Sequence, residues 1–298
     1  MTKHYQLGID GGGSGSRFSL LCEDSQTIST FNGPPLQLSQ KSEDDIFSAI
    51  CKTLDNHFHE ELFSLTHINM GIAGANSLKS TKKLRGEFRQ LYNCDTTLLS
   101  DSEAAFYTAF GLENPGMLLI NGTGSVILIS EAEQLKVFGG YGPDSNEILS
   151  GRSLGKLALL FASHLIEARK TLPDELFKAM PVRNRRELTR FIKQNKHNLP
   201  ALATPLLIEA ESNSDIQSIL ELEFNAYRMW LNSIKQAVNI PNQIALHGGL
   251  YGNAWFTEKV TGILKEANPD INYISKTNAV SEFLAKAPPN TIFRQIRL

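Results

Sequence analysis

The sequence predicts an α/β protein built from two duplicated halves that enclose a cleft. Apolar strand segments alternate with amphipathic helical segments, which is the pattern of a sheet with helices on its faces. A unit of strand, glycine turn and strand occurs near the start of the chain and again roughly 110 residues later, which indicates an internal duplication. A length of 298 residues is enough for two domains.

The first such unit is GIDGGGSGSRFSLL, Gly8 to Leu21. It is not a dinucleotide-binding loop, because the last glycine of G-x-G-x-x-G would fall on Ser16 and the next residues alternate like a strand. A G-x-x-x-x-G-K-[ST] loop is also absent: in SGRSLGKL, Gly151 comes one residue late and Leu157 offers no hydroxyl. Glycines let several N–H groups face one concavity, so this turn can bind phosphate. An ordinary tight hairpin is the alternative interpretation.

Helix and strand alternate after this first hairpin. Apolar residues at helical spacing predict a long amphipathic helix from Asp45 to Leu62. A buried strand is expected within HINMGIAGANS, residues 67–77. The order strand, polar junction, helix recurs in TTLLSDSEAAFYTAF, residues 96–110.

The second hairpin is MLLINGTGSVILIS, residues 117–130, in which two apolar strands flank a glycine turn with hydroxyl side chains. Chance could also supply a second glycine-rich hairpin, so duplication is one of two interpretations. After Ser150 the chain is expected to be mostly helical as far as Asn239, with a long amphipathic helix near 216–238 and a polar insertion around 183–199. A last strand is expected at 243–249, followed by a helix opened by glycine.

Composition excludes several classes of function. A formal net charge of −2 provides no basic stripe for nucleic acid. The start MTKHYQLGID is too polar for a signal peptide, and no apolar run is long enough to span a bilayer. Three scattered cysteines without a C-x-x-C pair favour reduced thiols and a cytoplasmic location. His57 and His59 make a poor metal pair, because side chains two positions apart on a helix point to different faces.

Six short motifs follow one another along nearly the whole chain, from Gly8 to Ala287: DGGGS, AGA, DSEAA, GTGS, GGYG and ALHGG. In this order they resemble the superfamily of acetate and sugar kinases, Hsp70 and actin. Within it, the chain resembles the BadF/BadG/BcrA/BcrD ATPase family, which includes N-acetylglucosamine and glucosamine kinases. The resemblance implies two ribonuclease H-like (actin-like ATPase) domains with an interdomain cleft. Their expected ranges are 1–114 and 115–298, with room for the last helix to pack back on the first domain.

The resemblance also implies a role for each matching residue. Asp10 would hold Mg²⁺ through water, and Asp101 would be the general base. The phosphates of ATP would be bound by two turns: Gly11, Gly12, Gly13 and Ser14 in the first, and Gly122, Thr123, Gly124 and Ser125 in the second. Gly248 and Gly249 would lie along the adenosine. The residues expected to line the sugar pocket are Gly74, Ala75, Gly140, Tyr141 and Glu147.

Asp101 has a second interpretation. The segment SDSE, residues 100–103, fits a capping box, so Ser100 or Asp101 could simply cap a helix. A helix N-terminus also favours an ionised carboxylate, which a general base requires at neutral pH.

Two segments depart from the family pattern. The kinases carry G-D-E-G-S-G after GG-x-G, whereas this chain has NEILSG at 146–151, so that Glu147 stands where the family has a sugar-binding aspartate. The kinases also place an asparagine after a G-P pair near the sugar, where GPPLQL offers Leu36 or Gln37. These departures put recognition of the 2-substituent of the sugar in question.

The resemblance therefore predicts a cytoplasmic, ATP- and Mg²⁺-dependent kinase that phosphorylates an amino sugar, with no nucleic acid or membrane partner and compatible with a homodimer. N-acetylglucosamine, phosphorylated at its 6-hydroxyl, is the first candidate acceptor and glucosamine the second. An activator ATPase of the same family is a rival, although its iron–sulfur cluster needs grouped cysteines. A sugar sensor without catalytic activity is the third interpretation.

Overall fold

The computed structural model describes residues 3–13, 15–38, 40–58, 64–75, 82–131, 134–142, 145, 147–274, 279–288 and 291. The chain forms two compact units. Unit 1 comprises residues 1–114 and 275–295, and unit 2 comprises residues 115–274 and 296–298.

Unit 1 is a five-stranded sheet in the order β3-β2-β1-β4-β5. Its strands are β1 (Tyr5–Gly11), β2 (Ser16–Cys22), β3 (Thr27–Gly33), β4 (Leu65–Ile72) and β5 (Asp95–Ser100). The first three strands pair antiparallel as a meander, while β4 pairs parallel with both β1 and β5.

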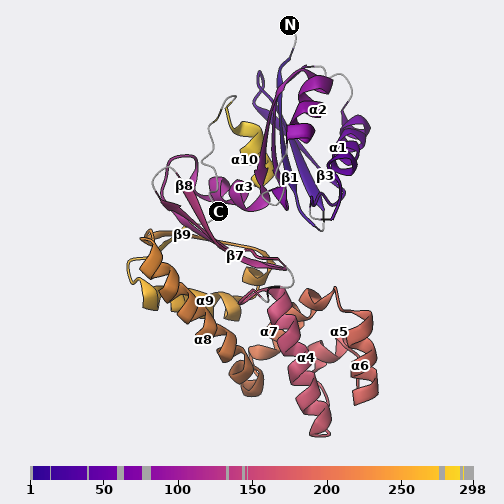
Figure 1. Cartoon of the computed structure of the whole chain (residues 1–298), viewed down its shortest axis with the longest axis vertical. Helices are drawn as coiled ribbons and strands as arrows, with labels where there is room; N and C mark the ends of the chain where they lie inside the picture. Colours follow the sequence, from indigo (N-terminus) through magenta and orange to yellow (C-terminus); the bar gives the residue numbers. More distant parts are fainter. Residues whose placement is uncertain are drawn as a thin grey trace. The chain divides into compact units, whose positions relative to one another are not determined.

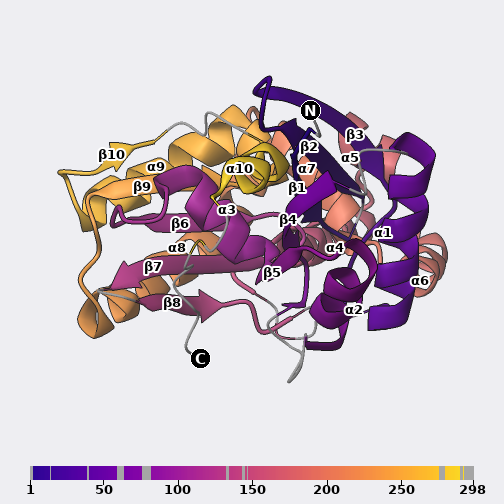
Figure 2. The ribbon, with the colours of Figure 1, turned by 90° about the horizontal axis from the view of Figure 1, so that it is seen from above.

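Helices cover both faces of this sheet (Figures 1 and 2). The helices α1 (Glu43–His57) and α2 (Lys82–Tyr92) cover one face, and their apolar side chains join those of β1 and β4 in the unit's core. The helices α3 (Asp101–Phe110) and α10 (Val280–Lys286) pack on the other face. Gly8 faces α10 and Gly71 faces α3, because a side chain on either glycine would overlap the helix above it.

Unit 2 repeats the same sheet, in the order β8-β7-β6-β9-β10 when counted from its meander edge. Its strands are β6 (Met117–Asn121), β7 (Ser125–Glu131), β8 (Gln134–Gly139), β9 (Gln243–His247) and β10 (Asn272–Tyr273). Again the first three strands are antiparallel and the last two are added in parallel. The predicted α/β fold with two duplicated halves is therefore confirmed.

After Ser150 the chain is mostly helical as far as Ala237, as expected. The α-helices of this segment are α4 (Gly151–Glu167), α5 (Asp174–Ala179), α6 (Arg185–Gln194), α7 (Ala203–Ala210) and α8 (Ser214–Ala237). Helix α9 (Ala254–Ala267) follows β9. No helix in the described ranges is long and apolar enough to cross a membrane.

Three sequence expectations need correction. The helix expected at Asp45–Leu62 begins at Glu43 with a Ser42 capping box and ends at His57, and Leu62 lies outside the described residues. The strand at Gln243–His247 is not the last, because β10 follows it. Helix α9 is opened by the side chain of Asn253, which accepts a hydrogen bond from Phe256 N at 2.8 Å, and not by glycine.

The side chain of His57, one of the two histidines weighed as a metal pair, makes contacts within unit 1. Its ring stacks on Phe31, with centroids 4.2 Å apart, and its Nδ1 donates to Thr53 O at 2.9 Å. His59 lies outside the described residues.

Gly8 tests how tightly α10 packs on β1. A Cβ at this position would lie 2.0 Å from Ser281 O and 2.4 Å from Ala285 N, both backbone atoms of α10. We expect Gly8→Ala to displace α10 and to lower the free energy of unfolding by about 1–3 kcal/mol. The control is Gly262→Ala in α9, where nothing lies within 4 Å of the added carbon and the change should be neutral or stabilising. Equal urea midpoints for the two variants would contradict this packing.

Candidate functional site

The first glycine turn joins β1 to β2 at the end of unit 1 where β4 and β5 also finish. Gly12 N donates to Gly15 O at 2.9 Å, which closes the turn. Gly12 O in turn accepts from Leu36 N at 3.0 Å. The N–H of Gly13 has no hydrogen-bond partner within the described residues, so it is available to a ligand. Ser14, expected to contribute to this turn, lies outside the described residues.

The glycines of this turn have different reasons to be glycine. A Cβ on Gly11 would lie 2.8 Å from the Cβ of Leu36, so the protein's own core requires that residue. Among the described residues, a Cβ on Gly12 would meet nothing nearer than Gly15 O at 3.5 Å, and no unusual φ requires glycine there. The chain's own packing thus leaves Gly12 unexplained, whereas close approach of a phosphate would explain it.

Asp101 is the first residue of α3, directly after β5. The capping box is made by its neighbours: Ser100 Oγ accepts from Glu103 N at 3.1 Å, and Ser100 N donates to Glu103 Oε2 at 2.8 Å. Asp101 therefore does not cap the helix. Its Oδ1 accepts from Ser102 N at 2.9 Å, and its side chain is exposed.

The pKa of the Asp101 carboxyl is raised above its ordinary value. Loss of hydration is the largest cause, and the neighbouring negative charge of Asp10 adds to it, while the N–H of Ser102 opposes it. The side chain is still exposed to water, so the loss of hydration is partial. The two carboxylates stand at the ends of β1 and β5, separated in the sheet only by β4.

The segment after β4 offers the proposed sugar pocket backbone groups more than side chains. Gly74 has a φ of +82°, and Ala75 is buried in the core of unit 1, so its methyl group does not face solvent. Of the two residues that the sequence offered near the sugar, Leu36 is fully buried. The amide of Gln37 lies against Gly13, because a Cβ there would be 2.5 Å from Gln37 Oε1. Gln37 is thus the polar residue of this pair beside the first turn.

The second glycine turn joins β6 to β7 in unit 2. Gly122 N donates to Gly124 O at 2.9 Å, and helix α4 begins against the turn, with Gly151 N donating to Gly122 O at 2.7 Å. No described residue lies within 4 Å of a Cβ on Gly122, and Thr123 is exposed. Ser125 is buried, and its N–H is engaged by Glu147. The N–H of Ser125 is therefore not available to a phosphate, whereas Thr123 and Gly124 are exposed.

Glu147 holds the second turn to the segment that follows β8. One carboxylate oxygen accepts from Ser125 N at 2.7 Å and the other from Gly142 N at 2.8 Å. A Cβ on Gly124 would lie 2.5 Å from Glu147 Oε2, so the carboxylate lies directly over the turn. Both oxygens already accept backbone N–H groups, so a contact between Glu147 and a sugar stays a prediction. Tyr141, predicted to line the same pocket, is 84% exposed.

Backbone geometry explains Gly140 and Gly248, but not Gly249. Gly140 has a φ of +70° and donates its N–H to Ser125 O at 3.1 Å. Gly248 has a φ of +112°, and a Cβ there would lie 2.2 Å from Asn121 O. Gly249 has open space around it, as an approaching adenosine would require.

Sequence reasoning missed three residues that hold this part of unit 2 together. The buried side chain of Asn121 donates to Leu149 O at 2.9 Å and accepts from the hydroxyl of Tyr251 at 2.6 Å. Glu223 of α8 accepts from Leu149 N at 2.9 Å. Asn121 directly precedes GTGS and Tyr251 directly follows HGGL. Their positions next to these motifs are the signal that could have identified them.

The fold is shared with proteins of known structure. A candidate N-acetylglucosamine kinase from Chromobacterium violaceum matches with a TM-score of 0.72 at 19% identity, covering 95% of this chain and 98% of that chain. A candidate N-acetylglucosamine kinase from Porphyromonas gingivalis matches with a TM-score of 0.70 at 15% identity, covering 93% and 97%. A ROK family glucokinase from Streptomyces griseus, solved in complex with glucose and AMPPNP, matches with a TM-score of 0.57 at 14% identity, covering 94% and 98%.

The chain has a sugar-kinase fold. At these identities the likeness concerns the fold, and it agrees with the predicted pair of actin-like ATPase domains. No protein-family model and no curated protein matches the chain. Membership of the BadF/BadG/BcrA/BcrD family therefore stays a prediction, as do the roles of the individual residues.

The predicted magnesium site has Asp10 as its acidic residue. No cluster of three or more His, Cys, Asp or Glu side chains suited to a metal ion occurs in the described part of the chain. Mg²⁺ does not require one, because it keeps several waters and is usually bound by one or two carboxylates together with substrate phosphates. Asp10, one residue before the first glycine turn, fits that mode of binding.

Glu147→Gln tests the connection between the second turn and Gly142. Glutamine can accept only one of the two N–H groups, and its NH₂ would face the other. We expect the free energy of unfolding to fall by about 1–3 kcal/mol, since hydrogen bonds to a charged acceptor are lost. Glu167→Gln, an exposed change at the last residue of α4, is the control and should alter it by less than about 0.5 kcal/mol. Urea denaturation that fails to separate these variants would contradict a structural role for Glu147.

Proposed function

We propose that this protein is an ATP-dependent kinase that transfers the γ-phosphoryl group to a hydroxyl of an amino sugar. The observation that carries the proposal is the position of Asp101. It stands at the carboxyl end of β5 outside the capping box, with Asp10 and the first glycine turn at the end of the same sheet. The fold around these residues is that of sugar kinases.

The glycine turns support the binding of phosphate. Gly12 and Gly122 lie in hairpin turns where the chain's own packing does not require glycine. Backbone N–H groups in such turns bind anions without any positive side chain. Asp10 would hold Mg²⁺, which neutralises charge on the phosphates when it is bound. The nucleotide proposal is also in line with the Streptomyces griseus glucokinase, whose structure contains AMPPNP.

Asp101 supplies the proton acceptor. The oxygen of the sugar hydroxyl forms a bond to the γ-phosphorus while the bond from that phosphorus to the bridging oxygen breaks, so that ADP leaves. The hydroxyl proton passes to the Asp101 carboxylate, whose Oδ2 is not used by the Ser102 N–H. Because Ser100 and Glu103 already cap α3, Asp101 can serve this role without a cost to the helix.

The acceptor we propose is N-acetylglucosamine at its 6-hydroxyl, with glucosamine as the second candidate. Two candidate N-acetylglucosamine kinases share the fold over almost the whole chain. Gln37, beside Gly13, offers an amide near the position where the resemblance expects an asparagine. The cytoplasmic location and a homodimer stay predictions.

A coupled assay of ADP release over a panel of hexoses and amino sugars tests this proposal. We expect N-acetylglucosamine or glucosamine to give the highest kcat/KM. A higher value for glucose would overturn the amino-sugar assignment. ADP release that is independent of every sugar would indicate an ATPase, and no release at all would indicate a sensor.

Asp101→Asn tests the general base. Asparagine keeps the shape and leaves the Ser100–Glu103 capping box intact, but it cannot accept the proton. We expect kcat to fall by about 10²–10⁴-fold, with the melting temperature and the affinity for ATP close to those of the wild type. A variant that keeps more than about a tenth of the wild-type kcat, well outside that range, would show that the base lies elsewhere.

Gly12→Ala tests the first phosphate turn. The structure accommodates the added methyl group, since its nearest neighbour would be Gly15 O at 3.5 Å. We therefore expect normal folding but ATP affinity reduced by about tenfold or more, the ratio that corresponds to about 1.4 kcal/mol. Calorimetry compares it with Gly262→Ala, which should bind like the wild type. Unchanged affinity for Gly12→Ala would mean that the turn is an ordinary hairpin.

The raised pKa of Asp101 predicts how activity depends on pH. A protonated carboxyl cannot accept the proton, so kcat/KM for the sugar should fall as the pH drops through this pKa. Since the pKa is raised, the acidic limb should have its midpoint above about 3.9, the ordinary value for aspartate. The measurement is the pH profile of kcat/KM. A midpoint at or below that value would contradict the assignment.

A further inference from the structure

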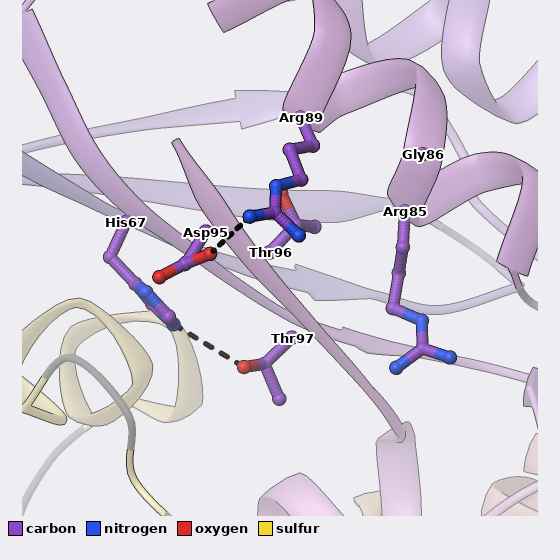
Figure 3. Close-up of a pocket in the computed structure, with 7 residues that line it drawn as sticks. All are labelled: His67, Arg85, Gly86, Arg89, Asp95, Thr96 and Thr97. Atoms are coloured by element: carbon purple, nitrogen blue, oxygen red, sulfur yellow. Dashed lines mark hydrogen bonds and ion pairs between the residues drawn. The ribbon is translucent and has the colours of Figure 1, made fainter. Parts of the chain in front are cut away.

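Unit 1 contains a pocket of about 410 Å³ at the end of its sheet opposite the glycine turn (Figure 3). It lies at the amino ends of β4 and β5, next to helix α2. Strand β5 begins in the pocket at Asp95 and ends next to Asp101, six residues later, a separation of roughly 20 Å at the usual strand rise. The pocket is therefore separate from the proposed catalytic end. Its lining residues are His67, Arg85, Gly86, Arg89, Asp95, Thr96 and Thr97.

Two arginines provide positive charge on one side of this pocket. Arg85 and Arg89 are four residues apart on α2 and so share one face of the helix. Arg89 makes only a loose ion pair with Asp95, with Nη2 and Oδ1 3.9 Å apart. Arg85 has no partner in the described ranges of the chain. Figure 3 shows both side chains descending from α2 toward β5. Guanidinium groups suit phosphate, because their planar donors can form two parallel hydrogen bonds to its oxygens.

His67 provides an unused acceptor in the floor of the pocket. The amide of Asn69 is oriented by its Nδ2, which donates to Leu284 O at 2.9 Å, so Asn69 Oδ1 must accept from His67 Nε2 at 2.9 Å. His67 Nε2 therefore carries the proton, and Nδ1 presents a lone pair. The ring is buried, only 3% exposed, and within the described residues its Nδ1 has no partner. Burial lowers the pKa of the imidazole, which keeps it neutral.

Two further polar side chains line the pocket, one as a donor and one as an acceptor. Thr97 Oγ1 lies 3.3 Å from His67 Nε2 and accepts from it, which leaves the threonine proton for an anion. The carboxylate of Asp95 is drawn beside the ring of His67 in Figure 3. Asp95 and His67 Nδ1 thus form a pair of acceptors that hydroxyl groups would satisfy, while Arg85, Arg89 and Thr97 form a group of donors. A buried acceptor without a donor is unfavourable, so a hydroxyl that displaced the groups covering Nδ1 would satisfy it.

We propose that this pocket binds a phosphorylated sugar, with the phosphate on Arg85 and Arg89 and the sugar hydroxyls on Asp95 and His67. A plain oxyanion would leave His67 Nδ1 without a donor, and an uncharged sugar would leave Arg85 without a partner in the described part of the chain. The proposed kinase reaction yields a molecule of this class, so the pocket would fill as product accumulates; that last step rests on the proposed function, whereas the site itself does not.

The first experiment compares two double variants by calorimetry. Arg85→Gln/Arg89→Gln removes the paired charges of the pocket. Arg186→Gln/Arg190→Gln removes an equal charge from an exposed pair of the same spacing on α6, in unit 2. The ligands are N-acetylglucosamine 6-phosphate, glucosamine 6-phosphate, inorganic phosphate and sulfate at constant ionic strength. In Arg85→Gln/Arg89→Gln we expect the affinity of one class of binding site for the sugar phosphates to fall by about tenfold or more, as the loss of a charge-assisted contact implies. In the α6 variant this affinity should not change. Equal binding by both variants would overturn the proposal.

His67→Gln tests the hydroxyl half of the pocket. The glutamine amide can still donate toward Asn69 but lacks an atom in the place of Nδ1. We expect the sugar phosphates to bind about tenfold more weakly, and sulfate, which has no proton to donate at neutral pH, to change by less than about twofold. An equal effect on sulfate and sugar phosphate would overturn the role of Nδ1. Binding that depends on Arg85 and Arg89 in a protein that releases no ADP would refute the proposed function and leave this site in place.

Discussion

The register of the parallel strands β1, β4 and β5 is the constraint on which the proposed active site depends. It aligns Gly11 with Ile72 and Ile72 with Ser100, so that all three strands end at the same level. The first glycine turn, the Ala73–Gly74 segment and Asp101 consequently emerge at one end of unit 1. A shift of one residue in either pairing would turn Asp10 to the other face of the sheet or move Asp101 along it. Helix α3, which begins at this end, is capped by Ser100 and Glu103, so Asp101 is not needed as a cap and is available for its proposed role.

The sequence predicts the strands whose patterns are local. Both glycine hairpins were found because apolar strands flank glycine-rich turns, and the long helix α8 was found because its apolar residues repeat at helical spacing. Strand β3, with its largely exposed pattern, and the two-residue β10 carry too little apolar signal to be recognised. Strand β2 was expected to alternate, yet it is buried on both faces. The reason is non-local: α10 covers Ser19, whose hydroxyl bonds Ser281, 262 positions later in the chain.

A candidate site residue could be predicted where one short motif contains it and implies its role. Motif order located the glycines and Asp101, and the capping box could be read from SDSE, although only the structure shows that Ser100 is the cap. The position of Glu147 was also anticipated, but not its two bonds to backbone N–H groups, because these depend on how the segment after β8 folds onto Ser125. The bond between Asn121 and Tyr251 joins residues 130 positions apart, so no local pattern could reveal it.

The central claim is that the chain transfers phosphate to a sugar hydroxyl and does not merely hydrolyse ATP. Phosphorus NMR of a mixture of protein, ATP, Mg²⁺ and N-acetylglucosamine or glucosamine measures this directly, since it separates phosphomonoester, ADP and inorganic phosphate. The account predicts a sugar phosphomonoester that grows in step with ADP, with little inorganic phosphate, and neither product in the absence of sugar. Inorganic phosphate that accumulates at the same rate with and without the sugar would contradict it.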